Sequence, residues 1–238
     1  MTLNNLKNLE EKYKQDFNRA LNLYETESSH EELINFLKNG SIVEKQVATL
    51  KLDGIYNEEE AKIFISNLVN CDGKIREAVS FRLKEFIKNT PKYYIDFPEI
   101  FLNAIVDING NICRNVIEAI QELEAYPQFI ENFCPKLIEN TIQVANIVNA
   151  FDIQDGKYKI NKQNFKLYWY LETIASFIEF IDEPTLIQII SLTINAQEYT
   201  IREKAAKILS KLKTSEITKE LKANLTNDSN YYVRRFTN

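Results

Sequence analysis

The chain has 238 residues, a net charge of −5, and only five glycines and five prolines. Hydrophobic residues make up 45% of it and charged residues 26%, which are ordinary values for a protein that folds around a core. All-β folds need many turn residues, and nucleotide-binding folds need a glycine-rich phosphate loop that this sequence lacks. Neither class is therefore expected.

The residues that usually carry catalysis or bind metals are scarce. His30 is the only histidine, so it would have to be the base of any serine or cysteine triad, and zinc sites built from several histidines are excluded. Cys71, Cys113 and Cys134 are odd in number and widely spaced, which predicts free thiols in a reducing compartment. We expect no catalytic, metal-binding or cofactor-binding residues, and hence no enzyme.

Neither a membrane span nor a secretion signal is expected from the sequence. No apolar run approaches 18 residues, and the first 14 residues are polar and charged rather than apolar. These features predict a cytoplasmic protein that does not bind a membrane.

Apolar residues recur three or four positions apart along the first half of the chain, which is the spacing of amphipathic helices. Capping residues mark several helix starts; Ser29 followed by Glu32, for example, is a capping-box pattern. The predicted helices span residues 1–25, 30–38, 41–52, 58–69, 74–88, 98–106 and 110–125.

In the second half, a pair of prolines repeats an earlier pattern. Pro91 and Pro98 are seven residues apart, Pro127 and Pro135 are eight apart, and each second proline closely follows an aromatic residue. We interpret each second proline as the start of an apolar helix, so a helix is expected to begin at Pro135. The further predicted helices span residues 141–151, 163–181, 184–195, 200–212 and 216–225, and a short last helix begins near 229.

One segment departs from the helical pattern. Phe151, Ile153, Tyr158 and Ile160 alternate with other residues on either side of Asp155-Gly156, which is a typical β-hairpin signal. We expect a small β-hairpin or an ordered loop near residues 151–161. A calcium-binding loop is the alternative, but the acidic ligand spacing of an EF-hand is absent.

Four junctions between a turn and a helix look alike, at residues 72–76, 109–114, 198–202 and 228–234. Each contains a polar turn residue, then an aliphatic residue, then an arginine; the arginines are Arg76, Arg114, Arg202 and Arg234. The 88 residues between the second and third arginines fit two periods of about 44. This pattern resembles the HEAT-repeat family, including its bacterial variants, although no such junction occurs near residues 145–162.

The resemblance implies a right-handed α-solenoid of about six stacked antiparallel helix pairs. It implies one domain over residues 1–238, with residues 1–28 as an N-terminal capping helix and residues 29–238 as HEAT-like repeats. In that family the polar turn residue and the arginine link neighbouring repeats. The arginines could instead bind phosphates, but the linking role is the structural expectation.

A solenoid without catalytic groups is expected to be a protein-protein interaction scaffold that uses its concave surface. The alternative is a nucleic-acid-binding solenoid, because one family of bacterial glycosylases for alkylated DNA bases consists of HEAT-like repeats. The acidic composition argues against this alternative, and no tryptophan-aspartate-arginine pattern supports it. The expected partner is therefore another protein rather than nucleic acid.

Charge is unevenly distributed along the chain. Residues 199–238 contain nine Lys or Arg against four Asp or Glu, a net +5, so the remainder carries −10. The cations proposed to contact an acidic surface, on a partner or on a second copy, are Lys204, Lys207, Lys211, Arg234 and Arg235. The ordinary alternative is a solvated helix face. Tyr168-Trp169-Tyr170 presents a similar choice between a stacking platform and core packing.

Overall fold

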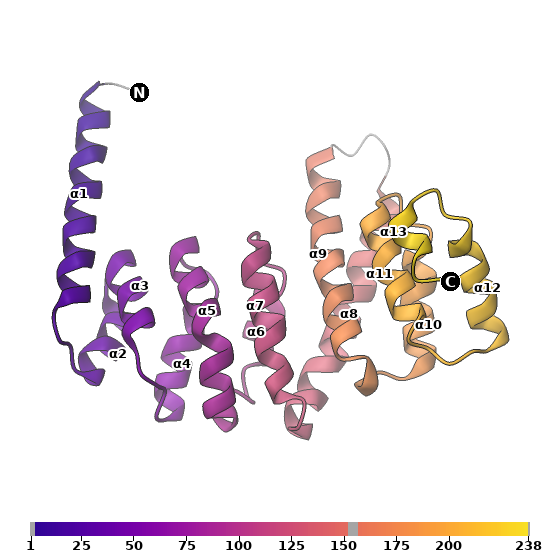
Figure 1. The fold of residues 1–238 in the computed structure, drawn as a ribbon, viewed down its shortest axis with the longest axis horizontal. Helices are drawn as coiled ribbons and strands as arrows, with labels where there is room; N and C mark the ends of the chain where they lie inside the picture. The colour runs from indigo at the N-terminus through magenta and orange to yellow at the C-terminus, as the bar shows by residue number, and fades with distance from the viewer. Residues whose placement is uncertain (1–2, 152–156, 238) are drawn as a thin grey trace. The chain divides into compact units, whose positions relative to one another are not determined.

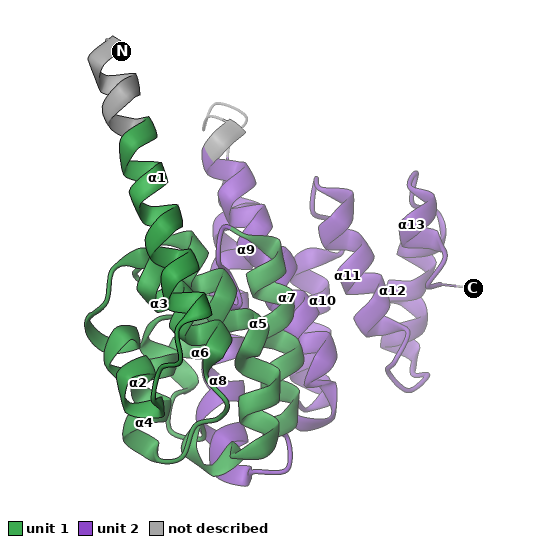
Figure 2. Ribbon diagram, turned by 60° about the vertical axis from the view of Figure 1, so that its left-hand side comes forward, with its two compact units in different colours: residues 1–104, 109–123 green, residues 105–108, 124–238 purple. Residues whose placement is uncertain are grey.

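The computed structural model describes residues 3–151 and 157–237. Figure 1 shows its helices in chain order. The chain forms two compact units, of which unit 1 comprises residues 1–104 and 109–123 and unit 2 comprises 105–108 and 124–238 (Figure 2). The expectation of a single domain over residues 1–238 stays a prediction.

Unit 1 consists of two layers of helices. Four helices pack side by side in the first layer: α1 (Leu3–Glu25), α3 (Ile42–Lys51), α5 (Gly73–Asn89) and α7 (Gly110–Ile120). Against them lie α2 (His30–Asn39), α4 (Glu58–Ser66) and α6 (Pro98–Ala104), with 3₁₀ turns at Pro91–Tyr93 and Gln121–Leu123. The two layers meet through α2 on α3 and α6 on α7, and α2 also packs on α4.

Unit 2 repeats this arrangement. Its first layer contains α9 (Lys157–Ser176), α11 (Tyr199–Leu209) and α13 (Tyr231–Arg234). Its second layer contains α8 (Pro127–Ala150), α10 (Glu183–Thr193) and α12 (Glu216–Thr226), and a 3₁₀ turn spans Ile178–Phe180. Helix α8 packs on α9 and α10, and α11 packs on both α10 and α12.

The helices after α1 follow one another as six consecutive pairs, α2–α3 through α12–α13. The part of the chain that the structure describes contains no β-strand. The prediction of an all-α repeat fold with about six helix pairs is therefore confirmed. Most helix starts were also predicted, because side chains such as Ser29 and Ser41 cap them as their sequence patterns indicate.

The predicted β-hairpin near residues 151–161 is wrong. Tyr158 and Ile160, expected in its second strand, lie within α9, which begins at Lys157. Residues 152–156, including the Asp155-Gly156 turn, lie outside the described part of the chain. Alternation over so few residues does not separate a strand from a helix, and the longer helical pattern that follows prevails.

The predicted helix start at Pro135 is also wrong. Helix α8 runs unbroken from Pro127 to Ala150 with Pro135 inside it. A proline within a helix removes one backbone donor and crowds the preceding turn. Here Phe133 and Leu137 are fully buried on either side of it, and their packing offsets that cost.

Aromatic side chains fill much of the core of each unit. In unit 1, Phe64 of α4 meets Phe86 of α5 edge to face, with ring centroids 5.0 Å apart. In unit 2, Phe133 stacks on Phe129 at 5.0 Å and contacts Phe177 at 5.3 Å. The Phe64–Phe86 contact joins the two helix layers of unit 1, and the Phe133–Phe177 contact joins α8 to the segment after α9 in unit 2. Burial of such rings is a large source of stability.

A lysine of α3 caps the end of α1. Lys51 Nζ donates to three carbonyl oxygens there, those of Leu23 at 2.9 Å, Tyr24 at 3.1 Å and Thr26 at 2.6 Å. The last carbonyls of a helix have no partner within it and carry partial negative charge, so a cation is favoured at this position. A side chain from the neighbouring helix therefore adds to the local bonds that Thr26 donates to the carbonyl of Asn22.

An arginine of α5 does the same for α3. Arg82 is mostly buried and donates to the carbonyl of Leu50 at 2.8 Å and to that of Leu52 at 2.9 Å. Its guanidinium also lies 4.6 Å from the centre of the Phe86 ring. Both caps point from one first-layer helix to the end of the preceding one.

Arg82→Ala should lower the free energy of unfolding by about 1.5–3 kcal/mol, the usual value for hydrogen bonds to a charged group. Urea unfolding followed by circular dichroism measures it. Lys88→Ala is the control, since Lys88 is an exposed lysine on the same helix and its loss should cost less than about 0.5 kcal/mol. Equal unfolding midpoints for the two variants would contradict the capping role.

Candidate functional site

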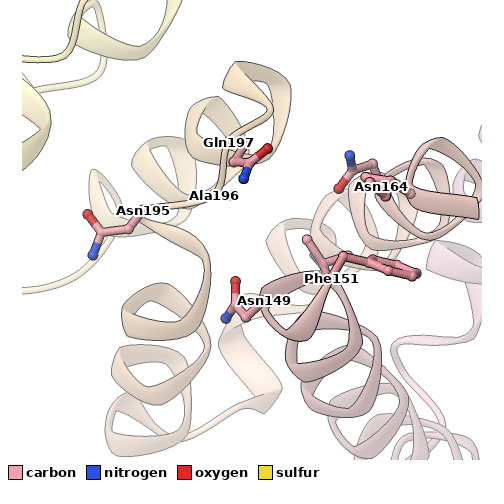
Figure 3. Close-up of a pocket in the computed structure, with 8 residues that line it drawn as sticks. Asn149, Phe151, Asn164, Asn195, Ala196 and Gln197 are labelled. Atoms are coloured by element: carbon pink, nitrogen blue, oxygen red, sulfur yellow. The ribbon is translucent and has the colours of Figure 1, made fainter. Parts of the chain in front are cut away.

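A pocket of about 170 Å³ lies within unit 2, where the end of α8, the start of α9 and the turn between α10 and α11 meet (Figure 3). Four side-chain amides and four apolar side chains surround it. The lining residues are Val148, Asn149, Phe151, Ile160, Asn164, Asn195, Ala196 and Gln197. We call this site the amide pocket.

The amides of the pocket differ in what they bind. Asn149 Nδ2 donates to the carbonyl of Leu192 at 2.9 Å, which ties α8 to α10. Asn164 Oδ1 is buried and has no hydrogen-bond partner among the residues that the structure describes. In Figure 3 the Asn164 amide points across the pocket toward Gln197, whereas Asn195 points away. The pocket is therefore lined by amide groups, and one of its lining residues holds a buried acceptor that has no partner among the described residues.

A largely buried arginine fixes the turn that forms one wall of the pocket. Arg202 Nη1 donates to the carbonyls of Ala196 at 2.7 Å and Gln197 at 2.9 Å. Its Nε and Nη2 make a bidentate pair with Asp228, at 2.6 and 3.1 Å. Two-point binding by a planar guanidinium fixes geometry as well as adding energy. The hydrogen bond from Arg202 also holds the pKa of Asp228 below its usual value.

The junction arginines thus play different parts. Arg202 links its own turn to Asp228, 26 residues later, as expected from the repeat pattern. Arg234 donates to the backbone carbonyl of the same Asp228 at 2.6 Å. Arg76 donates to the carbonyl of Cys71 in its own turn, and Arg114 is exposed. The predicted link between neighbouring repeats is confirmed for Arg202.

Next to the pocket, α9 and α11 are joined by a row of polar side chains. Glu172 of α9 lies 2.6 Å from Lys204 Nζ and 2.9 Å from Lys207 Nζ. Lys204 Nζ also sits 4.5 Å from the centre of the Tyr168 ring, a cation–π contact. We call Tyr168, Glu172, Lys204 and Lys207 the α9–α11 seam.

Burial and hydrogen bonding oppose each other in the seam. Burial by itself would raise the pKa of Glu172, but the hydrogen bonds from Lys204 and Lys207 outweigh it and lower that pKa. Burial would likewise lower the pKa of Lys204, but its hydrogen bond with Glu172 outweighs it and raises that pKa. Both groups therefore stay charged, and each depends on the other.

Each of the five predicted partner-binding cations contacts its own unit. Lys204 and Lys207 bind Glu172, and Lys211 donates to the carbonyl of Ala175 at the end of α9 at 2.8 Å. Arg235 binds Glu203 at 2.7 Å, and Arg234 binds Asp228 as described. Lys204 is only 9% exposed, so the three lysines do not form a solvated stripe. Their binding of a partner stays a prediction.

The aromatic run beside the seam follows the core-packing alternative. Trp169 and Tyr170 are buried, and Tyr168 is half-buried beneath Lys204. Consecutive helical residues face different directions, so these three rings do not form a shared stacking surface.

His30, which the sequence places at a helix start, joins three segments of unit 1. Its Nδ1 lies 3.1 Å from Asp53 and its Nε2 lies 3.0 Å from Glu60, and its ring stacks on Tyr56 at 4.3 Å. Carboxylates therefore contact both ring nitrogens of His30. Within residues 3–151 and 157–237 there is also no group of three or more metal-ligating side chains.

Sequence reasoning missed the amide pocket. Asparagine and glutamine are common on helix surfaces, and Asn149, Asn164 and Gln197 come from three different elements with no motif between them. Only the turn before Arg202, which resembles the other three junctions of the chain, marked the region, and it marked the framework rather than the pocket lining. Among the described helices, none has the length and apolarity to cross a membrane.

No protein-family model and no curated protein matches the chain. Among solved structures it is similar to an engineered protein, with 13% identity over 89% of this chain and 96% of that one and a TM-score of 0.49. It is also similar to a designed armadillo repeat protein in complex with the peptide (KR)4, with 11% identity over 88% and 97% of the two chains and a TM-score of 0.47. Such identities and scores carry no argument about function. The paired, layered helices themselves define an α-helical repeat protein of the solenoid type.

Arg202→Ala and Asp228→Asn should each destabilise the protein, by up to about 3–5 kcal/mol. Each substitution leaves the partly buried charge of the other residue without its partner. The double variant should lose less than the sum of the two, by about 1–3 kcal/mol, because the residues act as one pair. Urea unfolding of all four proteins gives this coupling energy. Strictly additive losses would show that the pair contributes nothing of its own.

Glu172→Gln should change how stability depends on pH. Since the folded pKa of Glu172 is lowered, its contribution is full above the unfolded glutamate pKa of about 4.3 and is lost as pH falls through the folded value. The stability difference between wild type and variant should therefore be largest near neutral pH and shrink in acid. A difference that stays constant from neutral pH to about pH 3 would refute the ion pair.

Proposed function

We propose that this chain is a non-catalytic scaffold of the HEAT type that binds an extended segment of another cytoplasmic protein through the amide pocket. The observation that carries this proposal is Asn164 Oδ1, a buried acceptor without a partner among the described residues. Buried polar atoms are nearly always hydrogen-bonded, so such an atom in the wall of a pocket suits a donor from a ligand.

The chemistry of the lining suits a peptide main chain. A side-chain amide offers one carbonyl acceptor and an NH₂ donor, which match the N–H and C=O of a peptide unit. An extended segment has these groups free, and affinity in such complexes comes largely from main-chain hydrogen bonds. The apolar part of the lining, Val148, Phe151 and Ile160, suits a small apolar side chain next to the bound peptide unit.

The turn that carries Gln197 forms a rigid wall of the pocket. Because Arg202 holds both carbonyls of this turn and is itself held by Asp228, little conformational freedom remains to be lost on binding. Preorganisation of this kind increases affinity by lowering the entropic cost of association.

The proposed scaffold is not an enzyme. This part of the proposal rests on the contacts of the histidine and the protonation of a buried cysteine. Both nitrogens of the only histidine contact carboxylates. Burial raises the pKa of the Cys134 thiol to about 11, so little thiolate is present at neutral pH. Lys204 and Lys207 of α11 are likewise engaged by Glu172, and Lys211, which follows α11, by the carbonyl of Ala175. These contacts leave the three lysines poorly placed to bind nucleic-acid phosphates.

The proposal is tested by selecting random peptides displayed on phage against the purified chain. Peptides recovered from the selection should bind Asn164→Ala about tenfold more weakly, which corresponds to the loss of one buried hydrogen bond. Asn161→Ala is the matched control, because Asn161 is an exposed asparagine on the same helix. Isothermal titration with synthetic peptides gives the affinities.

Two outcomes would contradict the proposal. One is a selection that yields no peptide with measurable affinity. The other is a set of peptides whose binding is unchanged by Asn164→Ala. A labelled single-stranded oligonucleotide serves as a parallel probe, and its binding in preference to the peptides would favour the nucleic-acid alternative instead.

A further inference from the structure

Helix α1 leaves its apolar face uncovered. Tyr13, Phe17 and Tyr24 lie along one side of it and are 65%, 66% and 68% exposed. No residue between 10 and 25 is buried, although α1 packs on α3. Amphipathic helices gain most of their stability by burying the apolar face, so this exposure indicates a contact that the described residues of one chain do not provide.

A groove beside this face provides room for a helix. It has a volume of about 590 Å³ and lies within unit 1, between α1, the start of α3 and the start of α5. Apolar groups form its sides, and two lysines and two aspartates form its edges. The lining residues are Lys12, Tyr13, Asp16, Phe17, Ala20, Ile42, Val43, Gln46, Asp72 and Lys74. The balanced charges favour an occupant that is itself apolar on one side and mixed in charge.

Helix α1 of a second copy would be such an occupant. The spacing of its apolar residues reads the same from either end of the helix. Tyr13, Phe17, Ala20 and Tyr24 are separated by four, three and four residues. This is the alternation of a coiled-coil seam. If a second α1 lies antiparallel to the first, Tyr13 is level with Tyr24 of the second copy and Phe17 is level with Ala20. In the middle of the seam each Phe17 then faces a small Ala20, and two tyrosines meet at each end, which favours close packing at the centre.

Charge agrees with the same alignment. The register that pairs Tyr13 with Tyr24 also places Lys12 level with Glu25 of the second copy, and the two-fold axis repeats this pair. Lys12 and Glu25 are both exposed, and Lys74 lines the same groove as Lys12. Opposite charges therefore meet at both ends of the seam.

We propose that the chain forms a two-fold symmetric dimer in which the α1 helices pair antiparallel, each lying against the groove of the other copy. In such an isologous contact the same surface is both wall and occupant. Tyr13 and Phe17 fulfil this requirement, because they line the groove and also belong to the exposed face.

The dimer is tested by sedimentation of the full chain between about 1 and 100 µM. Wild type should sediment as a dimer at the upper concentrations. Phe17→Glu should raise the dissociation constant at least about a hundredfold, because it places an unpaired charge in the seam. Phe81→Glu is the control: Phe81 is 70% exposed on α5 and does not line the groove, so its dimer should persist.

A charge exchange tests the register. Lys12→Glu and Glu25→Lys should each raise the dissociation constant about three- to tenfold, because each places like charges opposite one another. The double variant should return toward the wild-type value. A wild type that is monomeric at every concentration, a dimer unaffected by Phe17→Glu, or a double variant weaker than both single variants would overturn the proposal. Circular dichroism of each variant confirms that the helices remain folded.

Discussion

The stability of this protein depends on how the carbonyl groups at its helix ends and turns are satisfied. A helix leaves its last four carbonyls without internal partners, and short repeats have many such ends for their size. Cationic side chains in the next first-layer helix, or just after it, supply the donors. They are Lys51 of α3 at the end of α1, Arg82 of α5 at the end of α3, and Lys211, just after α11, at the end of α9. Each of these bonds joins neighbours that are distant in sequence.

The same device positions the candidate site. Arg202 satisfies the carbonyls of the turn that carries Gln197, and Asp228 in the next turn holds Arg202 in place. A turn fixed in this way becomes a rigid wall against which the amides of α8 and α9 form a pocket. The framework and the pocket are therefore not independent, since the bonds that join repeats also set the shape of the pocket.

The two ends of the described chain differ in how their polar and apolar side chains are paired. Near the C-terminal end, Lys204 and Lys207 both pair with Glu172, whose carboxylate offsets one of their two charges. Near the N-terminal end, α1 holds on to α3 through Arg19 and Glu44, 2.6 Å apart, and through Lys51, while its aromatic face stays exposed. Polar contacts fix that helix in place without burying its apolar side, and a second helix can complete it.

The sequence by itself determined the helices, because apolar periodicity and capping residues such as Ser29 and Asn57 act over a few residues. It also identified the repeat and the linking role of Arg202. It failed at Pro135 and at Tyr158, where local signals were overruled by packing and by a longer helical pattern. Only the tertiary structure decided the partners of Lys204 and Lys211. The tertiary structure also brought Asn149, Asn164 and Gln197 together. Such contacts join residues from 15 to 48 positions apart, and a charge or an amide carries no sign in the sequence of which distant group will meet it.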